Sequence, residues 1–474
     1  MKLMQAAILT ATALLAGCAI GPNYKRPNID TPAQYKEVSA QETPATPPPA
    51  QWWTLFNDPV LNDLESRVAV SNQNLAASEA AYRQAVAVVR QQRSTLFPSI
   101  SADAGVTKSG GGARSGGTVV TTPGGSVSRT SSSGGGEIYQ AGASASWEID
   151  LWGALRRSLE NAHALADASA SDLELAKLSM QTQLATTYLQ LREADAELRL
   201  LNDTVTAYQR AFQIAQNRYN VGMAVKSDVL QAQTQLANAK EQASEVVLSR
   251  AQGEHAIAAL IGVPAGSFTL ESRPDWQTAV PSVPSGVPST LLERRPDIAS
   301  AERRAMAASA SIGVAEAAYF PSLTLNGSYS FLSTSVDALF KSANAAHTIG
   351  ASLAQTVFDA GRTPARVAGA RAAYDQSVAE YRQSVLSAFQ DVEDQLAASR
   401  QLTEQYELRR QASEAADETE RLTLNQYRAG TVSYTNVVVA QASALSARVA
   451  LARVELQRQT TAIALIRSLG GEWN

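Results

Sequence analysis

Four short stretches of the chain alternate apolar residues with polar or small ones, a period of two that predicts β-strands. They are residues 100–106, 139–149, 323–331 and 349–358. Each is about ten residues long, the length that a tilted β-strand needs to cross a bilayer. An apolar face opposite a polar face favours strands with lipid on one side and water on the other. A four-stranded soluble sandwich is the alternative, but the remaining sequence predicts helices and offers it no further strands.

Four strands are too few to close a barrel, and the edge of an open sheet cannot lie in lipid because its backbone groups find no partner there. Closure therefore requires other copies of the chain. Two copies would supply eight strands and three would supply twelve, and the pattern does not choose between them.

A period of seven replaces the period of two over residues 154–219, which contain neither Pro nor Gly. This pattern predicts a coiled-coil helix of roughly 100 Å. One heptad position holds Leu184, Leu191, Leu198, Val205, Phe212 and Tyr219, and the other holds Thr187, Ala194, Leu201, Tyr208 and Ala215. We expect a return helix over 226–260 after a turn at Gly222, and a second hairpin over 363–469 that turns at Gly430. The abundance of Ala, Gln, Ser and Thr favours helices with one wet face over a solid bundle core.

The chain also repeats itself. Phe97-Pro98-Ser99 recurs as Phe320-Pro321-Ser322 (320 − 97 = 223), and Tyr219-x-x-Gly222 recurs as Tyr427-x-x-Gly430 (427 − 219 = 208). The first copy therefore holds 15 extra residues (223 − 208 = 15), in an interval that contains residues 109–136, rich in Gly, Ser and Thr. That composition predicts a long flexible loop. We expect one copy over residues 59–272 and the other over 291–474, each with a helix, two strands and a helical hairpin.

A Pro-rich segment at 273–290 separates the two copies and predicts an irregular linker. It leads into Arg294-Arg295-Pro296-Asp297-Ile298, where Pro296 suits a first helical turn. Asp297 would place a carboxylate near the positive end of that helix. We expect Arg294 and Arg295 to anchor the linker by ion pairs, and an anion-binding site is the alternative.

The N-terminus carries a targeting signal. Lys2 precedes the apolar segment 3–16, which is shorter than the roughly 20 residues of a membrane span, and Leu15-Ala16-Gly17-Cys18 has the pattern of a lipobox. We expect residues 1–17 to be removed as a signal peptide and Cys18, the only cysteine, to receive a covalent lipid. Ala19 at the next position favours sorting to the outer membrane of a Gram-negative bacterium. Residues 18–58 would form an extended segment behind this anchor, and past residue 17 we expect no transmembrane helix.

Composition and spacing argue against several functional classes. The net charge is −4 with 18% charged residues, so no basic surplus indicates a nucleic-acid partner. The three histidines, at 163, 255 and 347, lack metal-ligand spacing. Catalytic motifs are missing, and the acidic residues are spread along the predicted helices. We therefore expect no enzyme, no metal site and no cofactor other than the lipid on Cys18.

Four motifs together resemble the outer membrane efflux proteins of the TolC/OprM type, in the NodT-like lipoprotein branch. They are Gly17-Cys18-Ala19-Ile20-Gly21-Pro22-Asn23-Tyr24, Trp52-Trp53-x-x-Phe56-x-Asp58-Pro59-x-Leu61, Arg294-Arg295-Pro296-Asp297-Ile298-x-x-Ala301-Glu302 and Phe320-Pro321-Ser322-Leu323. The resemblance implies a mainly α protein with a small membrane β part. A homotrimer would form a 12-stranded β-barrel, four strands per chain, continued by a long periplasmic α-helical barrel. It implies an exit duct of a tripartite efflux system, which passes small molecules from a periplasmic adaptor and an inner-membrane RND pump to the outside.

The resemblance also places the two helix turns at the periplasmic tip of such a duct. The residues expected to dock the adaptor are Val221, Gly222, Met223, Ala429, Gly430, Thr431 and Val432. The gate would involve Asp228, Asn436 and Val439. Family members often carry aspartates just after the second turn, where this chain has Asn436 and Val439. We therefore expect a gate with a hydrophobic component and weaker cation binding than an aspartate ring.

Alternative functions are a TolC-like duct for protein secretion with an ATP-driven pump, a lipid-anchored periplasmic coiled-coil scaffold without a pore, and an enzyme with an unrecognised site. Because a wide water-filled duct is unselective, the sequence leaves drugs, solvents, metal ions and siderophores open as cargo.

Overall fold

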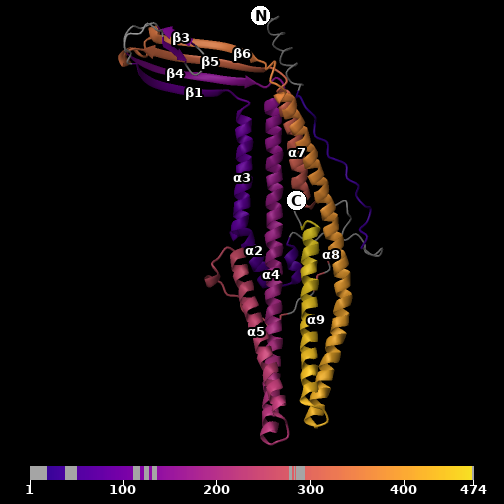
Figure 1. The fold of residues 1–474 in the computed structure, drawn as a ribbon. Helices are drawn as coiled ribbons and strands as arrows, with labels where there is room; N and C mark the ends of the chain where they lie inside the picture. The colour runs from indigo at the N-terminus through magenta and orange to yellow at the C-terminus, as the bar shows by residue number, and fades with distance from the viewer. Residues whose placement is uncertain are drawn as a thin grey trace. The chain divides into compact units, whose positions relative to one another are not determined.

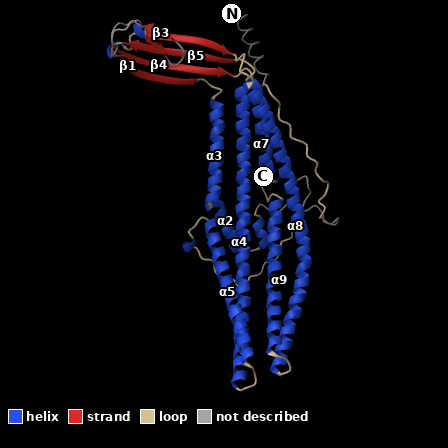
Figure 2. Cartoon of the chain, viewed as in Figure 1, coloured by secondary structure: helices blue, strands red, loops and turns tan. Residues whose placement is uncertain are grey.

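The computed structural model describes residues 19–37, 51–109, 118–121, 127–130, 136–276, 280–281, 283 and 294–471. The signal peptide, Cys18, most of the Gly/Ser-rich loop and most of the linker lie outside these residues. The described chain is mostly helical with a small β-sheet (Figures 1 and 2). It divides into two compact units, the first made of residues 1–27, 82–169 and 301–381, and the second of residues 28–81, 170–300 and 382–474. Both units combine segments from both halves of the sequence.

The first unit contains a four-stranded antiparallel sheet in the order β1-β4-β5-β6. Its strands are β1 (Ser99–Ser109), β4 (Gly136–Ile149), β5 (Ser322–Ser333) and β6 (Ala345–Ala354). β1 and β6 form the two edges of the sheet (Figure 1). The four alternating stretches of the sequence are therefore confirmed as strands.

The register of the sheet gathers the apolar positions of all four strands onto one face. Val106 pairs with Tyr139, Trp147 with Leu325, and Leu323 with Leu353, and directly paired residues lie on the same side of a sheet. The opposite face is polar: Ser101 hydrogen-bonds Ser144 at 2.9 Å, and other polar contacts lie beside them. The charged or polar exceptions on the apolar face are Lys108 opposite Glu137, Ser333 opposite Tyr139 and His347 opposite Tyr329.

Two details of the strand prediction were wrong. The last strand ends at Ala354, not at residue 358, because Ala354 already pairs with Ser322, the first residue of β5. Val357 and Phe358 beyond it are strongly exposed. Within the predicted loop, β2 (Thr118–Thr121) and β3 (Val127–Thr130) pair as a short hairpin, since both are rich in β-branched residues.

The helices preceding the strands also differ between the halves. The first half has two, α2 (Pro59–Ser71) and α3 (Gln73–Ser94), where we expected one. Asn72 divides them because its side chain accepts hydrogen bonds from the backbone N–H groups of Asn74 and Leu75. The second half has a single helix, α7 (Pro296–Ala317), which begins at the proline expected in a first turn.

The extended N-terminal segment packs closely in the first unit. The Ile20 N–H donates to the Trp152 carbonyl at 3.0 Å, and Arg157 donates to the carbonyls of Ile20 and Gly21. A Cβ at Gly21 would lie 2.4 Å from the Cα of Gly313. The residues directly after Cys18 are therefore held against the start of α4 and against α7.

The predicted hairpins are α4 (Ala154–Asn220) with α5 (Lys226–Leu260), and α8 (Arg362–Arg428) with α9 (Tyr434–Ser468). The second helices of the two hairpins, α5 and α9, contact each other. One heptad position of α4 is fully buried, at Thr187, Ala194, Leu201, Tyr208 and Ala215. The other loses its burial toward the turn, where Tyr219 is exposed.

Glycines of positive φ close the corresponding turns of both halves. Gly222 and Gly430 have φ of 73° and 78°, and Gly262 and Gly470 have 74° and 94°. At each, the backbone N–H three residues past the end of the helix donates to the carbonyl five residues earlier, as from Met223 to Arg218 and from Thr431 to Gln426. The helices of the two hairpins have equal lengths, 67 residues for α4 and α8 and 35 for α5 and α9.

Apolar residues of η1 (Trp52–Phe56) and α2 pack onto α4, α5 and α9 in the second unit. The cluster is built from Trp52, Trp53, Phe56, Leu61, Leu64, Val68, Leu75, Leu184, Ala185, Tyr188, Leu189, Leu191, Ile257, Ile261, Ile463 and Ile466. This cluster is the largest apolar core among the described residues and fixes the N-terminal motif against both hairpins. Among the remaining elements, η2 (Ala265–Ser267), η4 (Val336–Ala338) and η5 (Ser342–Asn344) are single turns.

One described helix, α9, is long and apolar enough to cross a membrane by length and composition alone. The expectation that no such run follows residue 17 is therefore wrong by this measure. The same composition occurs in core helices, and α9 buries Val437, Ala444 and Ile463 within its own unit.

Candidate functional site at the helix turns

The candidate site comprises the two turns of the helical hairpins, residues 221–225 and 429–433, with the first turns of α5 and α9. Both turns lie in the second unit. Each is short because a glycine in the left-handed conformation ends the first helix, and a Cβ at either Gly222 or Gly430 would meet nothing within 4 Å. Glycine is therefore favoured at these two positions by the backbone conformation and not by a lack of space for a side chain.

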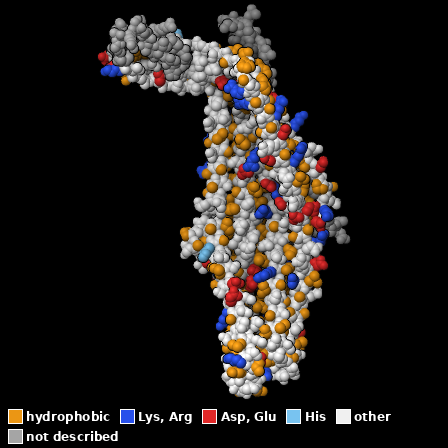
Figure 3. Space-filling model, in the orientation of Figure 1, with side chains coloured by type: hydrophobic (Ala, Val, Ile, Leu, Met, Phe, Trp, Pro, Cys, Tyr) orange, Lys and Arg blue, Asp and Glu red, His pale blue; other side chains and the backbone are white. Residues whose placement is uncertain are grey.

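The first turn exposes large apolar side chains. Val221, Met223 and Val225 are each more than 60% exposed. The second turn exposes the smaller Ala429, Gly430 and Thr431, while Val432 is half-buried. On the face drawn in Figure 3, hydrophobic side chains are scattered among uncharged polar ones around the turns. Exposed apolar residues of this kind are typical of a protein-binding surface.

An apolar cluster joins the two hairpins directly behind the turns. It contains Ala211, Ala215, Val229, Ala232, Tyr427, Tyr434 and Val437, with Val432 packed against it. Tyr427 and Tyr434 meet edge to face, with ring centroids 5.3 Å apart. Val432 therefore packs against the cluster that supports the turns and is also partly exposed at their surface.

Arg218 connects the first hairpin to the second. Its guanidinium lies 4.7 Å from the ring centroid of Tyr427 and donates a 3.2 Å hydrogen bond to the Tyr427 carbonyl. Burial raises the pKa of Tyr434 to about 12, and the Asp228 carboxylate contributes to that rise.

The three residues predicted for a gate occupy related positions. Asp228 and Asn436 are the third residues of α5 and α9, and Val439 follows one turn later on α9. Asp228 is half-buried, Asn436 is exposed and Val439 is 61% exposed. Nearby, Leu230 and Val438 line a shallow groove of about 350 Å³ between α5 and α9.

The contact between Arg218 and Tyr427 was missed from the sequence. The repeated Tyr-x-x-Gly motif did mark Tyr427, but the periodicity gave no sign that an arginine of the other hairpin would cover its ring. Two residues 209 positions apart (427 − 218 = 209) meet only because the hairpins pack together.

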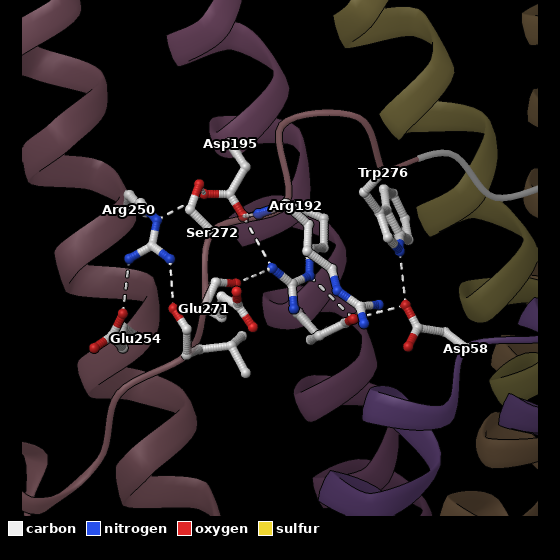
Figure 4. A network of polar contacts seen from close by, with 11 residues as sticks. Asp58, Arg192, Asp195, Arg250, Glu254, Glu271, Ser272 and Trp276 are labelled. Carbon is white, nitrogen blue, oxygen red and sulfur yellow. Dashed lines mark hydrogen bonds and ion pairs between the residues drawn. The ribbon is translucent and has the colours of Figure 1, made fainter.

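A second polar network holds the linker against the first hairpin (Figure 4). The side chain of Asp195 is fully buried and accepts hydrogen bonds from Arg192, Arg250, Ser272 and the Arg273 N–H, at 2.7–3.1 Å. Burial by itself would raise the pKa of the Asp195 carboxyl. The hydrogen bonds outweigh burial, that from Arg250 most strongly, and the pKa lies below its usual value.

The same arginines fix the backbone just before the linker. Arg192 donates to the Glu271 carbonyl and Arg250 to the Leu270 carbonyl, both at 2.7 Å. At the other end of the network, Asp58 accepts from the Tyr188 hydroxyl and the Trp276 indole N–H, both at 2.6 Å (Figure 4). Charged hydrogen bonds therefore hold the start of the linker, at Arg273 and Trp276, and hold the preceding backbone against α4 and α5.

Arg295 forms ion pairs, as expected, but they join the start of α7 to α8 and do not hold the linker. It pairs with Asp297 at 2.7 Å and with Asp391 at 3.2 Å, and donates to the Ser468 carbonyl. These partners account for the charge of Arg295 and leave the anion-site alternative without support at this residue. Among the described residues, His, Cys, Asp and Glu form no group of three that could hold a metal ion.

Long helical hairpins that end in closed turns, together with an antiparallel sheet that has one apolar face, define the class of outer membrane channels. A profile of the outer membrane efflux protein family matches residues 64–263 and 287–471. The chain belongs to this family.

Individual members of the family match this chain over nearly its whole length. The pyoverdine export outer membrane protein OpmQ of Pseudomonas aeruginosa is 28% identical over 473 residues, which cover 100% of this chain and 98% of OpmQ. The probable efflux pump outer membrane protein TtgC of Pseudomonas putida is 31% identical over 470 residues, which cover 97% of this chain and 94% of TtgC. The solved structure of the outer-membrane channel OprN has a TM-score of 0.85 at 29% identity, covering 96% of this chain and 100% of OprN.

Proposed function

We propose that the chain forms the outer membrane exit duct of a tripartite efflux pump, through which small molecules pass from a periplasmic adaptor and an inner-membrane RND transporter to the outside. Membership of the outer membrane efflux protein family supports the role as an efflux channel. The observation on the chain itself that supports it most is the sheet register, which collects apolar residues on one face and polar residues on the other.

The two free edges of the sheet support a closed assembly of several copies. In lipid, the unpaired backbone groups of β1 and β6 need partners, and another copy of the chain can supply them. On the family's plan, three copies would give a 12-stranded barrel with a water-filled bore, continued by an α-helical barrel. The equal helix lengths and matching left-handed glycines support an internal duplication, which would make such a barrel nearly sixfold symmetric in its helices.

The helix turns would meet the adaptor, through Val221, Gly222 and Met223 on the first hairpin and Ala429, Gly430, Thr431 and Val432 on the second. Exposed apolar groups at the first turn support a docking role. Asp228, Asn436 and Val439 would form the gate, closed by the packing of the hairpins through Arg218 and Tyr427. The lipid on Cys18 would anchor the duct, and the close packing of the residues after Cys18 supports a short tether.

The turns can be tested by photocrosslinking in cells. A benzophenone amino acid would replace Met223 on the first turn and Thr431 on the second, both exposed, and Leu248 on α5 as a similarly exposed control away from the turns. We expect Met223 and Thr431, but not Leu248, to capture a periplasmic adaptor of an RND system. Capture of a secretion adaptor would favour protein export, and capture of this chain alone from all three positions would contradict the docking role.

A further inference from the structure

The two edge strands of the sheet carry apolar side chains that the rest of the described chain leaves uncovered. On β6, Ile349 is 89% exposed and Leu353 is 67% exposed, and on β1, Ile100 is 78% exposed. Val357, three residues past the end of β6, is 94% exposed. Among the described residues, the outer side of each edge also lacks a neighbouring strand. In lipid, such an edge needs a partner for its backbone groups.

The register of the sheet follows the internal repeat of the sequence. Ser99 of β1 pairs with Ser146 of β4, and Ser322 of β5 pairs with Ala354 of β6. These two pairs are related by the offsets of the repeated motifs, 223 for the first strand (322 − 99 = 223) and 208 for the second (354 − 146 = 208). The pair β1 and β4 and the pair β5 and β6 are therefore two versions of one unit with one register.

The contact between these two units predicts the contact with a further unit. Within the chain, β4 pairs antiparallel with β5, and Ile149 lies opposite Leu323. When equivalent units continue around a closed barrel, β6 takes the place of β4, and β1 of a second copy takes the place of β5. The offsets then place Val357 (149 + 208 = 357) opposite Ile100 (323 − 223 = 100) of that copy.

The two faces of the sheet agree independently with this register. It places Ala351 opposite Val106 of the second copy and Leu353 opposite Ala104, and all four residues belong to the apolar face of their own chain. A register shifted by one residue would bring the apolar face of one copy beside the polar face of the other. A shift by two residues would keep the faces but would make the contacts between units unequal.

The same register accounts for the residues that follow β6. In the chain alone, β6 ends at Ala354, opposite the first residue of β5. Its counterpart β4 reaches the equivalent point at Ser146, but continues to Ile149 because it also pairs with β5 on its other side. A second copy's β1 would give β6 the same second partner. Residues 355–357 would then continue the strand, and the exposed Val357 would be covered.

We propose that β6 of one copy pairs antiparallel with β1 of a second copy in this register, and that residues 355–357 join β6 only when the second copy is bound. The partner is another copy of this chain, recognised through its free edge and through its apolar face. Lys108 of the second copy lies opposite Ile349 and keeps Glu137 of its own chain as a counter-ion at 2.9 Å. The proposal rests on the closed assembly proposed above and adds the register and the strand extension.

A pair of cysteines tests the register in outer membranes of cells that express the full chain. Thr356→Cys combined with Ser101→Cys places the two thiols directly opposite each other across the proposed seam. Because β4 and β5 lie between these edges within one copy, a disulfide between the two positions has to join two copies. Nonreducing electrophoresis after mild oxidation then shows covalent dimers and larger species. The wild type, whose only cysteine is Cys18, gives the background.

The equivalent pair inside one chain is the matched control. Glu148→Cys with Thr324→Cys joins directly paired residues of β4 and β5, and the loss of free thiols measures this disulfide. The repeat offsets convert this pair into Thr356 and Ser101 (148 + 208 = 356, 324 − 223 = 101). We therefore expect the pair across the seam to oxidise at a rate within about threefold of the internal pair.

Shifted pairs distinguish the register from assembly in general. They keep Thr356→Cys and carry the second cysteine at Ser99 or Asp103, on the same face of β1 as Ser101. We expect these pairs to form links between copies at least about fivefold more slowly, since diagonal neighbours are about 7–8 Å apart and a disulfide needs Cβ atoms within about 4.5 Å.

Three results would overturn the proposal in different ways. Faster linking of a shifted pair would refute the register and leave the assembly of copies standing. Linking by Thr356→Cys alone would show that two β6 edges meet, which the proposal excludes. Absence of any link between copies, while the internal control pair oxidises, would refute the closed assembly together with the register.

Discussion

The side chain of Val439 illustrates how a single residue at the turns would act. It is exposed on α9, one turn after Asn436, in the segment where the sequence has Asn and Val in place of the aspartates that family members often carry. An apolar constriction resists ions because water withdraws from it. We expect Val439→Ala to raise the resting conductance of the channel in planar bilayers severalfold. Leu248→Ala, which shortens a similarly exposed apolar side chain elsewhere on α5, serves as the control, and an unchanged conductance for Val439→Ala would count against the hydrophobic gate.

Glu193 is a residue whose charge state should affect stability near neutral pH. Burial raises the pKa of Glu193 to about 7, and the Glu197 carboxylate one turn away adds to the rise while Arg453 opposes it. Between about pH 4.5 and 7 the folded chain holds a proton that the unfolded chain has lost, so this contribution to stability falls as pH rises through that range.

We therefore expect Glu193→Gln to match the wild type near pH 4.5 and to be more stable by about 1–2 kcal/mol at pH 8. Denaturant unfolding at the two pH values would measure the difference. Glu404→Gln, an exposed position on α8, is the matched control. A stabilisation of equal size at both pH values would show that the effect comes from something other than the titration of Glu193.

At the scale of elements, the glycine turns determine where each hairpin reverses. Gly222 and Gly430 have positive φ and open space around a Cβ, so an alanine there is opposed only by the backbone conformation. We expect Gly222→Ala and Gly430→Ala each to lower the free energy of unfolding by about 1 kcal/mol. Gly369→Ala, inside α8 with the same open space, should instead stabilise the helix by up to about 1 kcal/mol. Thermal unfolding of the three variants checks the contrast, which fails if all three shift in the same direction.

At the scale of the whole molecule, we expect that lipidation of Cys18 and sorting by the residue after it can be changed independently by mutation. Cys18→Ser is expected to abolish incorporation of an alkyne fatty acid, because the chain has no other cysteine. Ala19→Asp should keep the lipid and move the protein from the outer to the inner membrane fraction. Labelling followed by membrane fractionation measures both outcomes. Label retained in Cys18→Ser would refute lipidation at this residue.

Much of the local architecture could be predicted because it depends on residues that are close in sequence. The period-two stretches became β1, β4, β5 and β6, and the heptads and glycines of 154–260 became α4 and α5 with a turn at Gly222. The predicted bounds were wrong where a pairing strand or a capping side chain sets the end of an element. The last strand ends opposite the first residue of β5, and the side chain of Asn72 caps α3 and so separates it from α2.

The sequence by itself determined the periodicities, the turns, the targeting motif and, through its motifs, the family. Only the tertiary structure decided that β4 lies beside β5, that Asp195 accepts from four donors, that Arg218 covers Tyr427, and that buried Glu65 has no hydrogen-bond partner among the described residues. The physical reason is the distance along the chain over which each interaction acts. Periodicity and φ preferences act between near neighbours in the chain, whereas burial and pairing bring together residues far apart in sequence and are defined only once the elements have packed.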